Sequence, residues 1–237
     1  MNTYVLIHGA WHGSWCWDKL VPLLIEEGHK VEAPDLPGHG RDKTPIPEIS
    51  LQTYTDRVCQ ILDAQSEPVI LVGHSMGGLV ITQAAEYRPK KIRTLVYLSA
   101  TLPRNGESLL QLAEGDKEAL VLPNLIMAED KTYATLKDEG IKEAFYGDCP
   151  DEDVARAKSL LVPQAAAPFI TPVRTTEENF GRVRRVYISC LRDKAITPSL
   201  QAKMYRAVPC EKVIAMDTSH SPFFSAPEKL AGHLLLL

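Results

Sequence analysis

The chain has 237 residues, of which 45% are hydrophobic and 24% are charged, and its formal net charge is −4. This composition is typical of a single folded domain with a sizeable core, and it argues against a nucleic-acid partner because duplex-binding surfaces are normally basic. No apolar run approaches the roughly 18–20 residues that span a bilayer, so we expect no membrane partner.

Short β-rich runs alternate with helical stretches over the first hundred residues, and the same rhythm returns at the end of the chain. Strands are predicted at residues 3–8, 29–33, 68–73, 92–99, 184–190 and 211–216. Helices are predicted at residues 17–27, 50–64, 75–87, 197–206 and 226–235, the second of them with Ser50 as its N-cap. Alternation of this kind predicts an α/β fold, in which helices flank both faces of a mostly parallel sheet.

Residues 103–182 break the alternation. Helices are predicted there at residues 107–113, 133–139 and 152–160, joined by loops that contain prolines. We interpret this segment as a helical cap inserted into a core that consists of residues 1–102 and 183–237, with the whole chain forming one domain.

The strongest chemical signal is the G-x-S-x-G motif at residues 73–77 (GHSMG), with Ser75 at its centre. It lies directly after a predicted buried strand and directly before a predicted helix, which is the context of a nucleophile elbow. A Cβ atom at either glycine would clash in so tight a turn, while the helix start points its positive end at the serine. A chance match is the alternative, but the strand–turn–helix context makes it the weaker explanation.

A serine needs an adjacent base, and a carboxylate must hold that base in the correct tautomer. His220 follows the last predicted strand through a short polar loop, and Asp193 follows the preceding strand at the same edge of the sheet. The order Ser75, Asp193, His220 is the order expected for this arrangement. Asp217 is a rival carboxylate, and Asp193 could instead be an ordinary turn residue.

Donors for an oxyanion are expected from the backbone N–H groups of Met76, next to the nucleophile, and of Ala10, in the loop after the first strand. Trp11 and Leu102 are candidates for the substrate pocket because both lie in loops at the same sheet edge. Apolar cap pairs at 145–146 and 169–170 are expected mainly to fill the interface between cap and sheet.

The glycine-rich loop at residues 35–40 is interpreted as a structural turn. Neither a metal-ligand spacing nor a G-x-G-x-x-G motif occurs, so we expect no metal and no cofactor.

The cysteines favour a reducing compartment. There are five of them, an odd number, and no two have the C-x-x-C spacing. Neither a disulfide framework nor a structural zinc site is therefore predicted. The first residues also lack the basic region and long apolar run of a secretory signal. We expect a cytoplasmic protein.

The chain resembles the plant methylesterase and hydroxynitrile lyase branch of the α/β-hydrolases, together with its bacterial relatives. The resemblance extends over nearly the whole chain and is carried by residues 4–24 (YVLIHGAWHGSWCWDKLVPLL), 69–78 (VILVGHSMGG), 145–164 (FYGDCPDEDVARAKSLLVPQ), 189–201 (SCLRDKAITPSLQ) and 217–228 (DTSHSPFFSAPE). It implies an α/β-hydrolase fold with a sheet of about six strands, hydrolysis of small esters without a cofactor, and homodimers as a frequent assembly.

The sequence departs from the cyanide-releasing lyases of that branch. Those members carry a lysine directly after the catalytic histidine and a threonine in the first loop, whereas this chain has Ser221 and Gly9 there. A serine carboxylesterase acting on small, mainly apolar esters, methyl esters among them, is therefore the preferred hypothesis. A lyase, an acyltransferase on the same scaffold, and a small-molecule receptor that retains the triad remain open as alternatives.

Overall fold

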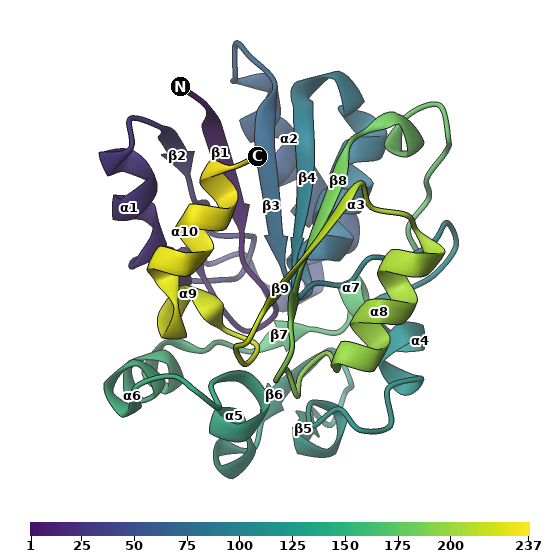
Figure 1. Ribbon diagram of the computed structural model, residues 1–237. Coiled ribbons are helices and arrows are strands. Elements are labelled where there is room, and N and C mark those ends of the chain that lie inside the picture. The colour runs from purple at the N-terminus through teal and green to yellow at the C-terminus, as the bar shows by residue number, and fades with distance from the viewer.

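The central feature of the fold is a six-stranded parallel sheet, seen in a computed structural model that describes residues 1–237. Its strand order is β2-β1-β3-β4-β8-β9, and every neighbouring pair is parallel (Figure 1). The strands are β1 (Thr3–Ile7), β2 (Lys30–Glu32), β3 (Val69–His74), β4 (Ile92–Leu98), β8 (Arg185–Cys190) and β9 (Lys212–Met216). The α/β-hydrolase fold and the sheet of six strands are confirmed.

Helices cover both faces of the sheet. Helix α1 packs against α10 and helix α2 packs against α3, and the two pairs lie on opposite faces (Figure 1). Their bounds, with those of α8 and α9, are α1 (Leu20–Glu26), α2 (Leu51–Asp63), α3 (Gly77–Tyr87), α8 (Pro198–Ala207), α9 (Pro222–Ser225) and α10 (Pro227–Leu235). Because all six residues of β3 are buried, this strand is shielded on both sides, as its unbroken apolar sequence predicts.

The carboxyl ends of the central strands meet at one edge. The last residue of β1, Ile7, is opposite Gly73 of β3, and His74 is opposite Leu98 at the end of β4. Ligands bind at this edge in open α/β sheets. The loops that follow β1, β3, β4, β8 and β9 carry every residue proposed above for the site.

Residues 103–182 cover that edge of the sheet (Figure 1). The segment contains four α-helices and a separate antiparallel sheet of order β5-β6-β7. The elements are α4 (Leu109–Glu114), β5 (Leu125–Met127), β6 (Tyr133–Leu136), α5 (Asp138–Phe145), α6 (Asp151–Leu160), β7 (Gln164–Ala165) and α7 (Ala167–Ile170). The cap is therefore a mixture of helices and strands, and no helix of the protein is both long and apolar enough to span a bilayer.

One helix prediction within the cap is wrong. Residues 133–139 form strand β6 up to Leu136, and helix α5 begins only at Asp138. Strand β6 pairs on both sides, with β5 and β7, and its Ala134 carbonyl also accepts the indole N–H of Trp11 at 3.0 Å. These contacts are made with distant residues, so they override the local helical preference.

The N-cap prediction at Ser50 is confirmed. The Ser50 hydroxyl accepts the Thr53 N–H at 3.1 Å, while the Thr53 hydroxyl accepts the Ser50 N–H at 2.9 Å. This reciprocal pair satisfies two backbone donors that the first turn of α2 would otherwise leave free.

We expect Ser50→Ala to lower the free energy of unfolding by about 1 kcal/mol, because it removes the acceptor at the N-cap. Urea denaturation of the purified variant measures the change. The control is Ser159→Ala, an exposed serine inside helix α6, which should leave stability equal or slightly higher. Equal stability of Ser50→Ala and the unmodified protein would contradict the capping role.

Candidate active site

Ser75 lies in the turn between β3 and α3 and has φ +54°, a left-handed conformation that non-glycine residues rarely adopt. The turn is tight because its neighbours lack side chains. A Cβ at Gly73 would lie 2.7 Å from the Gly77 backbone, and one at Gly77 would lie 2.6 Å from the Ile7 carbonyl oxygen. Both glycines are therefore required by close backbone contact, and the turn presents the Ser75 side chain at the sheet edge.

Asp193 and His220 form a buried pair at the same edge. His220 Nδ1 lies 2.7 Å from Asp193 Oδ2, and both side chains are fully buried. The carboxylate also accepts the N–H groups of Ala195 and Ile196, at 2.7 and 3.0 Å, and the Gln201 amide at 3.1 Å. These donors hold the carboxylate so that it accepts the Nδ1 proton, which leaves His220 Nε2 as the basic nitrogen.

The alternative carboxylate, Asp217, points elsewhere. It is exposed and pairs with Arg192 at 2.9 Å. Asp193 is thus the carboxylate that contacts the His220 ring.

The His220 loop is anchored to the turn that carries Ser75. The His220 carbonyl accepts the Nε2–H of His74 at 2.9 Å and the Ser99 hydroxyl at 3.3 Å. The two imidazole rings lie in contact, with centroids 4.5 Å apart. His220 Nε2 is buried and has no hydrogen-bond partner, so no hydrogen bond joins it to the Ser75 hydroxyl in this structure.

The two predicted oxyanion donors lie beside Ser75. Ala10 and Met76 are buried, at 4% and 1% exposure, and both line the cavity that contains Ser75. Neither backbone N–H donates a hydrogen bond within the protein. Unpaired buried N–H groups are rare, and here both belong to residues of the cavity wall.

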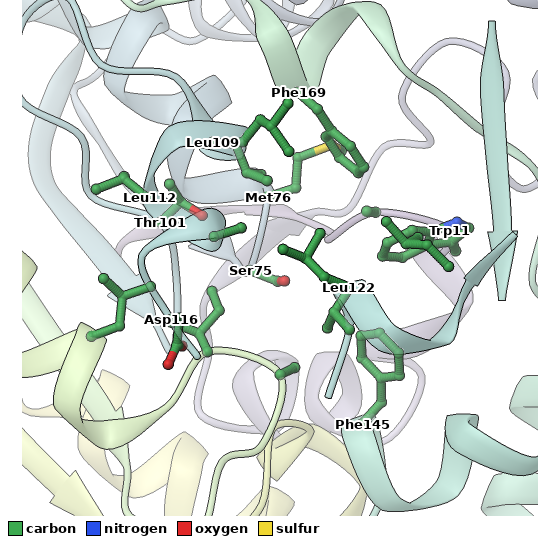
Figure 2. Close-up of a pocket in the computed structure, with 18 of the residues that line it drawn as sticks. Trp11, Ser75, Met76, Thr101, Leu109, Leu112, Asp116, Leu122, Phe145 and Phe169 are labelled. Atoms are coloured by element: carbon green, nitrogen blue, oxygen red, sulfur yellow. The ribbon is translucent and has the colours of Figure 1, made fainter. Parts of the chain in front are cut away.

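The cavity is almost entirely apolar, since 16 of its 19 lining residues are hydrophobic. It encloses about 680 Å³ when the open space at its mouth is included. Figure 2 shows the Ser75 hydroxyl among these side chains. The labelled wall residues are Trp11, Met76, Thr101, Leu109, Leu112, Asp116, Leu122, Phe145 and Phe169.

The two pocket candidates behave differently. Trp11 lines the cavity, but Leu102 does not, and this prediction is corrected. Leu102 is buried in the core with its N–H 3.3 Å from the sulfur of Met204, while its neighbour Thr101 faces the cavity. Successive residues of an extended segment point in opposite directions, so the choice between neighbours depends on a backbone orientation that the sequence does not reveal.

Several cap residues of the wall were not predicted as pocket residues. Phe145 and Phe169, expected mainly to fill the interface, line the cavity, and Leu109 and Leu112 of α4 join them. The only signal in the sequence was their apolar character.

Asp116 is the one charged residue of the wall, and its carboxylate accepts both the N–H and the hydroxyl of Thr197, at 2.9 and 2.7 Å. No group of three or more His, Cys, Asp or Glu side chains is arranged to hold a metal ion.

Comparisons with known proteins agree with this architecture. The model of the alpha/beta hydrolase family matches residues 4–233. The chain is 37% identical to putative methylesterase 11, chloroplastic, of Arabidopsis thaliana, covering 100% of this chain and 63% of that protein. It is 34% identical to the pyrethroid hydrolase of Sphingobium wenxiniae, covering 98% of this chain and 85% of the hydrolase. The crystal structure of polyneuridine aldehyde esterase matches with a TM-score of 0.89 and 28% identity, over 99% of this chain and 98% of that one.

Three further histidines surround the site and are buried in their neutral form. Burial lowers the pKa of His8 to about 3 and that of His12 to about 4, because the charged ring cannot be solvated. Burial also lowers the pKa of His74 well below its usual value, with the neighbouring rings of His220 and His12 adding to the shift.

As the pH falls through about 6.5, each of these rings is protonated in the unfolded chain but stays neutral in the folded protein. The folded pKa lies below the unfolded one, so the stabilising contribution is complete above pH 6.5 and is lost progressively toward pH 4. We expect the free energy of unfolding to fall by up to about 1.4 kcal/mol per pH unit for each histidine. Urea denaturation at pH 7.5, 6.5 and 5.5 measures it.

In a His12→Phe variant, the free energy of unfolding should fall less steeply with falling pH, by the contribution of one histidine. A free energy of unfolding that stays constant over this pH range would show that the three rings are not held neutral.

Proposed function

The chain belongs to the alpha/beta hydrolase family, in the group that contains the plant methylesterases, and from this we propose that it is a serine carboxylesterase acting on small, mainly apolar esters. One observation carries the proposal. The buried Asp193–His220 pair is anchored to the turn that presents Ser75 to an apolar cavity. The chain spans 63% of the length of putative methylesterase 11 and 85% of that of the pyrethroid hydrolase.

Acylation begins when His220 Nε2 removes the proton of the Ser75 hydroxyl as its oxygen attacks the ester carbonyl carbon. Rotation of the serine side chain toward Nε2 on substrate binding completes this contact, since catalytic hydrogen bonds often tighten only in the complex. The carbonyl electrons move to oxygen, where the N–H groups of Ala10 and Met76 stabilise the charge. Asp193 stabilises the imidazolium, and no other imidazole nearby needs to carry charge.

Collapse of the tetrahedral intermediate breaks the bond to the alcohol oxygen, which takes the proton from His220 Nε2. Water then enters, gives a proton to the same nitrogen and attacks the acyl carbon. The second intermediate collapses, Ser75 regains its proton from His220, and the carboxylic acid leaves. No cofactor is required in either half of the reaction.

The cavity wall supports an uncharged substrate. Burying alkyl or aromatic groups of a substrate against its apolar side chains is favourable, and the wall has no cationic side chain that could pair with an anionic group. Asp116 would repel a carboxylate, which favours release of the acid product. Two relatives, named a methylesterase and a pyrethroid hydrolase, carry names of ester-cleaving enzymes, and this supports the same substrate class here.

The cytoplasm is the compartment that we propose, and a homodimer is the assembly that the family resemblance favours. All five cysteines are free, four of them buried, which suits a reducing environment. Some relatives are named chloroplastic, so the compartment is best tested by fractionation.

Replacing the nucleophile gives the direct test of function. Ser75→Ala should lower kcat/KM for p-nitrophenyl acetate by at least about 10³-fold, because the acyl-enzyme cannot form. The exposed Ser66→Ala serves as the control and should retain full turnover. An unchanged rate in Ser75→Ala would rule out the proposed role. The same assay run with cyanohydrins and with added alcohols tests the lyase and acyltransferase alternatives.

Trp11 lies between the cavity and a neighbouring groove, and we expect it to limit the length of the acyl group that the cavity accepts. Its indole lines the cavity and also a groove on its other side, and it contacts Phe145 and Phe169 edge-on. Trp11→Ala should join the two spaces and raise kcat/KM for p-nitrophenyl octanoate relative to the acetate by about tenfold. Leu161→Ala, which changes only the groove, should leave this ratio unaltered. A ratio unchanged in Trp11→Ala would mean that the indole does not limit the substrate.

A further inference from the structure

The loop that carries the Ala10 N–H is held at two successive carbonyl groups by two imidazole rings. His8 Nδ1 lies 2.8 Å from the Gly9 carbonyl oxygen, and His12 Nδ1 lies 2.7 Å from the Ala10 carbonyl oxygen. These two carbonyls are the ones that flank the Ala10 N–H along the chain. Neither ring takes part in the acyl-transfer steps above.

The His8 ring fixes the peptide that contains the donor itself. Its Nε2 accepts the Leu36 N–H at 3.0 Å, so in the neutral ring the proton is on Nδ1, which donates to the Gly9 carbonyl. The Gly9 carbonyl and the Ala10 N–H belong to one planar peptide, and the chain has no cis peptide bond. In a planar trans peptide the two groups point in opposite directions, so holding the carbonyl against His8 turns the N–H away from that ring.

The His12 ring connects the same loop to the cap. The Ala10 carbonyl can only accept, so His12 Nδ1 carries the proton and Nε2 accepts the Tyr146 hydroxyl at 2.6 Å. Tyr146 is fully buried directly after helix α5, and the preceding residue, Phe145, lines the cavity. Burial raises the pKa of the Tyr146 phenol well above its usual value, so the hydroxyl remains a donor.

We propose that His8, His12 and Tyr146 are positioning residues that aim the Ala10 N–H at the developing oxyanion, an inference that rests on the proposed esterase function. The two carbonyl anchors fix the peptides on both sides of Ala10. The His8 contact also polarises the Ala10 N–H, because the Gly9 carbonyl that it holds belongs to the same peptide group. The Tyr146 hydroxyl links the oxyanion loop to the cap, because it donates to His12 Nε2 while His12 Nδ1 donates to the Ala10 carbonyl.

Tyr146→Phe tests this with the smallest change, because only the hydroxyl is removed, whereas a variant of His8 or His12 removes a whole ring and two hydrogen bonds. We expect kcat to fall roughly tenfold, less than the 10²–10³ seen when an oxyanion donor is deleted, with KM within twofold. The inhibition constant of phenylboronic acid, which forms a tetrahedral adduct at the serine, should rise by the same factor. Binding of the product acid should stay unchanged.

Tyr4→Phe is the matched control, since Tyr4 also donates a buried hydroxyl to a single acceptor, the Leu234 carbonyl at 3.0 Å, away from the site. It should lose comparable stability and keep kcat. Equal kcat and equal boronate inhibition in Tyr146→Phe and the unmodified enzyme would overturn the proposal, as would an equal fall in both variants.

A measurement that needs no turnover separates this proposal from the esterase assignment. The amide exchange rate of Ala10, followed by NMR in protein labelled at alanine, should rise in Tyr146→Phe and not in Tyr4→Phe. A rate that does not change would overturn the positioning role even in an active esterase. A loss of function in Ser75→Ala bears only on the esterase assignment.

Discussion

The backbone at the end of β3 turns within very few residues into α3, and the geometry of the whole site depends on this turn. The conformation at Ser75 costs roughly 1–3 kcal/mol and persists only because the surrounding structure enforces it. The enforcing contacts are close approaches to the backbone of glycines. A Cβ at Gly78 would lie 2.2 Å from the Thr101 carbonyl oxygen, and one at Gly9 would lie 2.8 Å from the Ser75 Cβ. The helix start, the oxyanion loop and the loop after β4 can converge on Ser75 only because glycines occupy these contact positions.

A second constraint is that several imidazoles are packed together where water is excluded. His74 contacts His220, and His12 contacts His74, with ring centroids 4.5 and 6.2 Å apart. Charged neighbours at such distances would repel strongly, so the arrangement favours a positive charge on only one ring of the group at a time. The carboxylate of Asp193 is placed against His220 alone, which selects it as that ring. The remaining histidines act through their neutral hydrogen-bonding atoms, holding backbone carbonyls in place.

Much of this architecture was predictable because it is encoded in short stretches of sequence. The six strands follow from local apolar runs. The positions of Ser75, Asp193 and His220 follow from one rule, that functional residues come directly after parallel strands. The limits of that rule are also clear. The helix prediction at residues 133–139 fails because strand β6 depends on pairing with distant strands. The prediction of Leu102 fails because the sequence does not reveal which way a side chain in that loop points. The Tyr146–His12 contact joins residues 134 positions apart, and no local pattern predicts it.

The proposed acyl transfer passes through a covalent ester on Ser75, and trapping that ester shows whether it forms. The enzyme is mixed with a slowly hydrolysed p-nitrophenyl ester, quenched with acid within the first turnover, digested and analysed by mass spectrometry. We expect one acyl group per chain, located on the peptide that contains Ser75 and absent when His220 is replaced by alanine. Turnover without any acylated peptide, or an acyl group on a different residue, would contradict it.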